Sequence, residues 1–169
     1  MNTRLSFAGS LATLVLLETI CMIGCGEVRA QSDLPHFKDY SVSEMYKGKT
    51  ASLVLNRDDL PFKTRLRSAA RNQKPNFAGH YILTSWGCGA ECLMGAVIDA
   101  KTGKVYRLSF SICCWGADVD DKFNPIEFRR DSSLIVFSGL RNEKQDDDGT
   151  HFYQFENGRF VHLRSIPKP

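Results

Sequence analysis

Signals of local structure are densest between Phe77 and Tyr106. This stretch reads Phe77-Ala-Gly-His-Tyr81, then Trp86-Gly-Cys-Gly-Ala-Glu-Cys92, and then Gly95-Ala-Val-Ile-Asp-Ala-Lys-Thr-Gly-Lys-Val-Tyr106. Apolar residues alternate in its flanks, which is typical of β-strands, and its glycines mark positions where the backbone must turn or be approached closely. The block therefore predicts a strand, a cysteine-bearing turn and a hairpin in succession.

The same pattern continues toward the C-terminus. Short segments rich in β-branched and aromatic residues alternate with turn signals. The strands we expect are 81–86, 93–100, 104–110, 126–130, 134–138, 151–156 and 159–164. Asp99-Ala-Lys-Thr-Gly103 and Asn157-Gly158 are hairpin turns by composition, since each offers a residue that accepts a left-handed backbone. This half of the chain predicts an antiparallel meander.

Residues 31–76 have a mixed pattern. Apolar residues of 60–74 roughly share one helical face, with four basic residues around the rest, so we expect an amphipathic helix there. Asp58 or Asp59 is expected to cap it and Pro75 to stop it. A short helix over 42–46 and a short strand over 51–55 complete the expected elements. The predicted fold class is α+β: a mainly antiparallel β meander or sheet with one amphipathic N-terminal helix packed on it.

The first thirty residues resemble a secretory signal peptide. A basic start at Arg4 precedes an apolar run over 5–23, and Val28-Arg-Ala30 fits cleavage between small residues. We therefore expect residues 1–30 to be removed after Ala30 and residues 31–169 to form a single globular domain, helical or mixed over 31–76 and β-rich over 77–169. The expected location is periplasmic or secreted.

Two alternatives remain for this segment. In the first, it is a lipoprotein signal, and the mature chain is anchored through a lipid on Cys25. In the second, it is retained as a membrane anchor, which Glu18 disfavours because a carboxylate is costly in hydrocarbon.

Composition and charge narrow the class of protein. The chain has 169 residues, 43% of them hydrophobic and 24% charged, which is enough for one core. Its formal net charge of +3 does not change when residues 1–30 are removed, because that segment carries equal numbers of basic and acidic residues. Such mild basicity does not indicate a nucleic-acid partner, which requires a dense basic face.

The expected mature chain contains Cys88, Cys92, Cys113 and Cys114, and export makes disulfides permissible. Four cysteines allow three pairings, and the spacing does not choose among them. Cys88 or Cys92 can bond to the later pair, or the first two can close a tight turn. A bond between adjacent cysteines is strained, because their Cα atoms lie about 3.8 Å apart. We assign all four to structural disulfides, since the spacing suits neither a zinc site nor a C-x-x-C redox motif.

Other candidate functional residues gather near the cysteines. His80 is a candidate general base, with Cys88 or Cys92 as its nucleophile. The candidate binding residues are aromatic or acidic and lie in expected loops: Trp86, Glu91, Trp115, Asp118 and Asp121. Acidic runs at 118–121 and 146–148 are considered as calcium ligands, but neither run has the spacing of an EF-hand loop. No metal site and no cofactor is predicted.

The block also resembles a known family. Asn76-Phe-Ala-Gly-His-Tyr81, Trp86-Gly-Cys-Gly-x-x-Cys92 and Asp99-x-x-Thr-Gly-Lys-Val105 are similar to the motifs of an uncharacterised family of small exported bacterial proteins with no established activity. The resemblance implies a location in the bacterial envelope and a pairing of Cys88 with Cys92. Cys113 and Cys114 are an addition to that pattern.

Two functions follow as hypotheses. The first is a non-catalytic binding or interaction module that holds a protein, a glycan or a small ligand through the loops over 86–92, 115–121 and 141–149. The second is a hydrolase or thiol enzyme that uses His80 with Cys88 or Cys92. The enzyme hypothesis requires a free thiol within hydrogen-bond reach of the imidazole.

Overall fold

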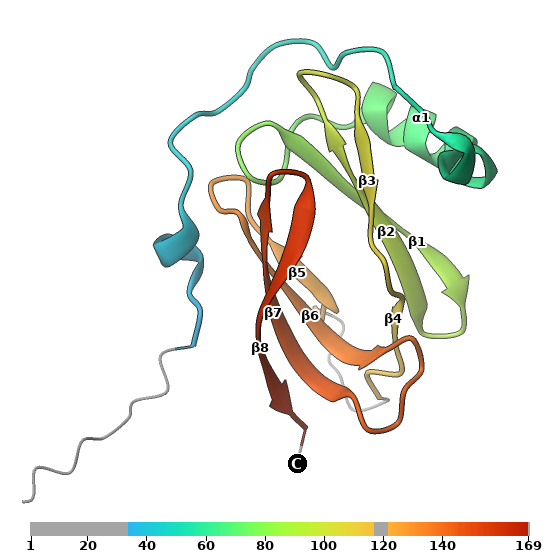
Figure 1. Cartoon of the computed structure of the whole chain (residues 1–169), viewed down its shortest axis with the longest axis vertical. Helices are drawn as coiled ribbons and strands as arrows, with labels where there is room; N and C mark the ends of the chain where they lie inside the picture. The colour runs from blue at the N-terminus through green and yellow to red at the C-terminus, as the bar shows by residue number, and fades with distance from the viewer. Residues whose placement is uncertain (1–33, 117–121, 169) are drawn as a thin grey trace, which may run out of the picture. The chain divides into compact units, whose positions relative to one another are not determined.

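The computed structural model describes residues 34–116 and 122–168, and the strands of these residues form one antiparallel sheet (Figure 1). The strands are β1 (Tyr81–Gly89), β2 (Cys92–Asp99), β3 (Val105–Arg107), β4 (Ile112–Cys113), β5 (Ile126–Phe128), β6 (Leu134–Arg141), β7 (Asp148–Glu156) and β8 (Arg159–Pro167). Their order is β1-β2-β4-β6-β7-β8, with β3 also paired to β2 and β5 also paired to β6. The sheet is therefore not a simple meander.

The predicted α+β class is wrong. The described residues are mostly antiparallel β-sheet, and their one α-helix, α1 (Lys63–Asn72), has only 10 residues. It buries just Leu66 and Ala69, and it covers only the outer face of β1 and β2. A helix of this size cannot cover a sheet of eight strands, so most of the core is made by strands packing against strands.

The core lies where the sheet folds over on itself. Side chains alternate along each strand, so Leu83 of β1 and Val97 of β2 face Phe137 of β6 and Tyr153 of β7 in one buried cluster. The opposite faces bury separate clusters, one under α1 and one beneath Phe37 and Tyr40 near the start of the described chain. β4 joins the two halves of the sheet, since its two residues pair with β2 on one side and with β6 on the other.

The segment before the sheet corrects several expectations. Residues 42–46 form no helix; a short 3-10 helix, η1, occupies Phe37–Tyr40 instead. The strand expected over 51–55 reduces to one bridge, between Val54 and Lys104. A second 3-10 helix, η2 (Arg57–Phe62), precedes α1, and Asn56 rather than an aspartate caps it by accepting from two backbone N–H groups. The extended part of this segment runs past turns at the ends of the strands, and single backbone hydrogen bonds join it to the carbonyl groups of Asp131, Gly79, Ala100 and Gly103.

Both expected hairpin turns are confirmed. Gly103 has a φ of 76° and its N–H donates to the carbonyl of Asp99, closing the turn between β2 and β3. Asn157 and Gly158 have φ values of 50° and 74°, as a tight two-residue turn between β7 and β8 requires. Within the described residues, no helix has the length and apolar character needed to cross a bilayer.

Candidate functional site

The Phe77–Tyr81 block, which contains His80, forms a tight turn that enters β1. Ala78 and Gly79 have positive φ angles, and a Cβ at Gly79 would overlap the carbonyl oxygen of Glu44. The carbonyl of Gly79 accepts from the N–H of Tyr46 at 3.0 Å. The block therefore fastens the extended N-terminal segment to the sheet.

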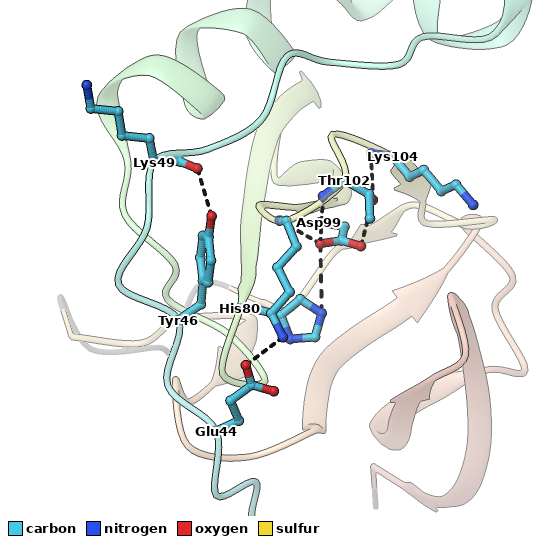
Figure 2. Close-up of polar contacts among 8 residues, drawn as sticks. Glu44, Tyr46, Lys49, His80, Asp99, Thr102 and Lys104 are labelled. Carbon is cyan, nitrogen blue, oxygen red and sulfur yellow. Dashed lines mark hydrogen bonds and ion pairs between the residues drawn. The ribbon is translucent and has the colours of Figure 1, made fainter.

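His80 and Asp99 come together at this corner (Figure 2). Their Nε2 and Oδ1 atoms lie 3.8 Å apart, and the imidazole stacks on Tyr81 with ring centroids separated by 4.0 Å. Burial lowers the pKa of His80 below its ordinary value, and the Asp99 carboxylate opposes that shift only in part. At neutral pH, the imidazole beside Asp99 is accordingly uncharged.

The oxygens of Asp99 are already engaged. Oδ1 accepts from the N–H of Lys101 at 2.8 Å, and Oδ2 accepts from the hydroxyl of Thr102 at 2.7 Å. Beside them, the Lys101 ammonium pairs with Glu44 at 2.7 Å (Figure 2). Asp99 and Lys101 are thus engaged within this corner, which is the pattern of a closed hairpin turn, whereas His80 lies beside Asp99 at a distance longer than a hydrogen bond.

Cys88 and Cys92 form a disulfide across the β1–β2 turn, which confirms that pairing. In this state neither residue has a thiol to act as nucleophile for His80. Cys113 and Cys114 carry free thiols, so the structural disulfide expected to involve them is not formed. Their sulfur atoms nevertheless lie close, at 2.7 Å, with the Cys114 thiol donating to Sγ of Cys113.

The candidate binding residues that the structure describes, Trp86, Glu91 and Trp115, do not converge. Trp86 is buried against Phe62, with ring centroids 5.1 Å apart, and therefore belongs to the core under α1. Glu91 lies exposed at the tip of the β1–β2 turn, where its φ is 44°. Asp118 and Asp121 lie outside the described residues, as do Cys25 and the expected cleavage point at Ala30. Trp86 also lines an open pocket beside α1, and Trp115 borders a separate cavity at the other end of the sheet.

The cavity beside Trp115 has a volume of about 490 Å³. It lies over the ends of β6, β7 and β8, and the rings of Trp115 and Phe123 form part of its wall with their centroids 6.3 Å apart. The space exists because the strands present small side chains there: Ser138 pairs with Thr150 across β6 and β7, and both line it. A volume of several hundred Å³ is typical of small-molecule sites.

Asp148, the first residue of β7, supplies the acidic group of this cavity. Its Oδ1 is buried and has no hydrogen-bond partner among the described residues. The preceding residue, Asp147, does not line the cavity, and both of its oxygens accept from Arg141, at 2.7 and 2.6 Å. Arg141 holds the pKa of Asp147 below its ordinary value. Two neighbouring aspartates thus differ, since Asp147 is paired with Arg141 and Asp148 has spare acceptor capacity.

Lys168 closes the side of the cavity near the C-terminus. Its backbone N–H donates to the carbonyl of Asp148 at 3.0 Å, and its ammonium lies 3.4 Å from the carbonyl oxygen of Trp115. Gly149 permits this close approach, since a Cβ there would overlap the carbonyl of Ile166 in β8. The backbone pairing of β7 and β8 therefore fixes the position of Asp148 relative to β8, and Lys168 links this end of the sheet to Trp115.

Comparison of the chain with protein-family models, with curated proteins and with solved structures finds no match. The resemblance to the exported bacterial family accordingly stays a prediction. Phe123, Asp148 and Lys168 line the cavity but had not been named as candidate site residues. The signals in the sequence were the acidic run that contains Asp148, considered for calcium, and the loop over 141–149, named among those of the binding module.

Proposed function

We propose that this protein is an exported, non-catalytic binding domain whose ligand occupies the cavity between Trp115 and Asp148. The ligand class that fits has an apolar or aromatic body and a hydrogen-bond donor with positive charge, such as a primary ammonium group. The body packs against Trp115 and Phe123, and the donor reaches Asp148.

The observation that carries this proposal is the buried, unpartnered Oδ1 of Asp148 in an aromatic cavity. Leaving a buried acceptor without a donor costs about 1–3 kcal/mol, and more when the group is charged. A ligand N–H that reaches this oxygen recovers that cost, and a charged donor makes the hydrogen bond roughly twice as strong. Aromatic faces add attraction for a cation, worth about 0.5–2 kcal/mol.

The ammonium of Lys168 opposes a cationic ligand only weakly. Its side chain is exposed, and the Nζ atom is directed to the Trp115 carbonyl at the edge of the cavity. Charges exposed to solvent are screened over about 8–10 Å at physiological ionic strength, whereas a buried atom such as Oδ1 of the half-buried Asp148 is screened less. Asp148 therefore favours a ligand with positive charge.

Export is supported by two features. The first thirty residues have the pattern of a secretory signal, and Cys88 and Cys92 are joined in a disulfide, a bond that persists mainly in oxidising compartments. Mass spectrometry of the protein from a bacterial envelope fraction tests this part. A chain that starts at Gln31 supports cleavage after Ala30, a lipid on Cys25 supports the lipoprotein alternative, and an intact Met1 in the cytosolic fraction contradicts export.

Calorimetric titration with phenethylamine and with 2-phenylethanol tests the binding function. The two probes share an aromatic body and differ in the ammonium group, so we expect the amine to bind about tenfold more tightly, a difference of about 1.4 kcal/mol. Asp148→Asn should remove this preference, and Trp115→Ala should weaken both probes. Asp146→Asn, which changes an exposed acid nearby, is the matched control.

Equal affinity for both probes, or an amine preference that survives Asp148→Asn, would contradict the proposed role of Asp148. An absence of binding for either probe, in protein shown to be folded, would contradict the cavity as a site for this ligand class.

A further inference from the structure

The four cysteines of the described chain lie in one cluster around the junction of β2 and β4. Cys92 is directly opposite Cys113 in the β2–β4 pairing, and the two share a buried cluster with Leu140 of β6. The N–H of Cys114 donates to the carbonyl of Glu91 at 3.0 Å, which makes Cys92 and Cys113 a non-hydrogen-bonded pair. Side chains are closest at such positions, with Cβ atoms about 4.5–5.5 Å apart.

Exposure follows a simple order through this cluster. Cys88 and Cys114 are exposed, whereas Cys92 is 9% exposed and Cys113 is 1% exposed. Cys88 is bonded to Cys92, Cys92 lies opposite Cys113, and Cys113 touches Cys114. The sulfur atoms therefore run from one exposed thiol position to another through two buried ones.

We propose that these cysteines form an internal thiol–disulfide exchange relay in which Cys113 attacks Cys92. The thiolate of Cys113 bonds to Sγ of Cys92, the Cys88–Cys92 bond breaks, and Cys88 leaves as a thiolate that takes up the proton lost by Cys113. In a second step, the Cys114 thiolate bonds to Sγ of Cys113 and Cys92 leaves. One disulfide and two thiols are present throughout, so no external oxidant or reductant is needed.

The resting state is the one in the structure. A Cys113–Cys114 disulfide joins adjacent residues and is strained, so the equilibrium lies toward the Cys88–Cys92 bond. Cys92–Cys113 is the intermediate between them, and its formation exposes a free thiol at Cys88. This relay is independent of the ligand cavity beside Trp115 and goes beyond the proposed binding function.

The outside partner that suits the relay is a peptide thiol or disulfide. Cys88 and Cys92 line a cavity of about 390 Å³ that also presents Arg107, Asn142 and Glu143. These side chains offer both donors and acceptors to a peptide backbone or its charged ends. A partner held there meets the sulfur that the exchange releases.

The exchange should be slow at neutral pH. Burial, together with the hydrogen bond from Cys114, raises the pKa of Cys113 to about 11, and only the thiolate attacks. Below that pKa, the thiolate fraction increases about tenfold for each pH unit. The rate of internal exchange should follow the same slope between neutral and mildly alkaline pH.

Alkylation of the folded protein with iodoacetamide, in the absence of any reductant, tests the relay. Iodoacetamide modifies Cys114 at once, which blocks the second step, and it then traps Cys88 whenever Cys113 displaces it. Acid quenching and peptide mapping identify each product. The matched variants are Cys113→Ala and Cys114→Ala, which remove the attacking thiol and its neighbour respectively.

We expect modified Cys88 together with a Cys92–Cys113 linked peptide in the wild-type protein and in Cys114→Ala, at a rate independent of protein concentration. Modification of Cys88 should fall at least tenfold in Cys113→Ala. Unmodified Cys88 in the wild-type protein at alkaline pH would overturn the relay, as would equal modification in Cys113→Ala. If Cys113→Ala does not fold, the presence or absence of the Cys92–Cys113 peptide in the other two proteins decides.

Discussion

Asp99 and Asp148 lie at ends of strands in the same sheet, yet their surroundings differ in one decisive respect. Asp99 accepts hydrogen bonds from Lys101 and Thr102 of its own turn and lies beside His80. Asp148 has a buried oxygen with no partner among the described residues, in a cavity with two aromatic rings. A satisfied carboxylate closes a turn, whereas an unsatisfied one has capacity left for a ligand.

The two regions also differ in how clearly the sequence marks them, and the region with the clearer motif is not the one proposed to bind a ligand. The glycine-rich motif around His80 is the densest in the chain, and its polar groups are used to hold the turn and the N-terminal segment. The Trp115 cavity has no motif, because its parts come from three strands and two separate loop positions. Substitutions at the two places should therefore have opposite consequences for stability and for binding.

The largest expected effect is on the stability of the His80 corner. Gly79→Ala forces a non-glycine residue to a φ of 79° and places a methyl group against the Glu44 carbonyl. We expect a loss of about 2–4 kcal/mol in the free energy of unfolding, measured by urea titration. Gly87→Ala is the control, since its Cβ would meet its nearest atom at an ordinary 3.9 Å, and a similar loss there would contradict the explanation.

The next largest effect on stability is expected at Asp99. Asp99→Ala leaves several turn donors without their acceptor, so we expect it to lower the free energy of unfolding by about 1–3 kcal/mol. The same change at exposed Asp146 should alter stability by less than about 0.5 kcal/mol. Amine binding should be retained in Asp99→Ala, and its loss in folded protein would show that the two regions are not independent.

Asp148→Asn should behave in the opposite way. It replaces a buried, unpaired carboxylate oxygen by a neutral group of the same shape, so we expect stability to be unchanged or to increase by up to about 1 kcal/mol. Thermal and urea unfolding measure this change. A loss as large as that of Asp99→Ala would mean that Asp148 has a structural role and no spare capacity.

The smallest effect concerns pH. Burial is the main cause of the lowered pKa of both His80 and His151, while in the unfolded chain histidines titrate near 6.5. As the pH falls below about 6.5, the unfolded chain binds protons that the folded protein does not, so the free energy of unfolding should decrease. Above that pH, the contribution of the two uncharged histidines to stability is fully present. His80→Gln should remove the His80 share alone. Urea titrations from neutral to mildly acidic pH that show constant or rising stability would contradict this.

Most of the sheet could be predicted from the sequence, since alternation of side chains is a local property. The strands β1, β2 and β6 and the turns at Gly103 and Asn157 follow their expected positions closely. β4 was missed because two residues carry no periodicity of their own, and pairing on both sides creates the strand. The α+β fold class was wrong because the amphipathic pattern of residues 60–74 predicts a helix clearly, whereas the helix that forms covers little of the sheet.

The cavity could be predicted only in part. Trp115 was recognisable as an aromatic residue beside a glycine, but its contact with Phe123 depends on tertiary structure. The strand expected over 151–156 begins too late, because pairing with both β6 and β8 draws residues 148–150 into β7. The partner of Cys113 was equally hidden, because its position opposite Cys92 depends on the register of β2 and β4.

A crystal structure of the protein with bound phenethylamine tests the role of Asp148 most directly. We expect the ammonium nitrogen within hydrogen-bond distance of Asp148 Oδ1, with the phenyl ring against Trp115 and Phe123. An amine that binds elsewhere, or a cavity that stays empty at saturating amine, would contradict the assignment of this site.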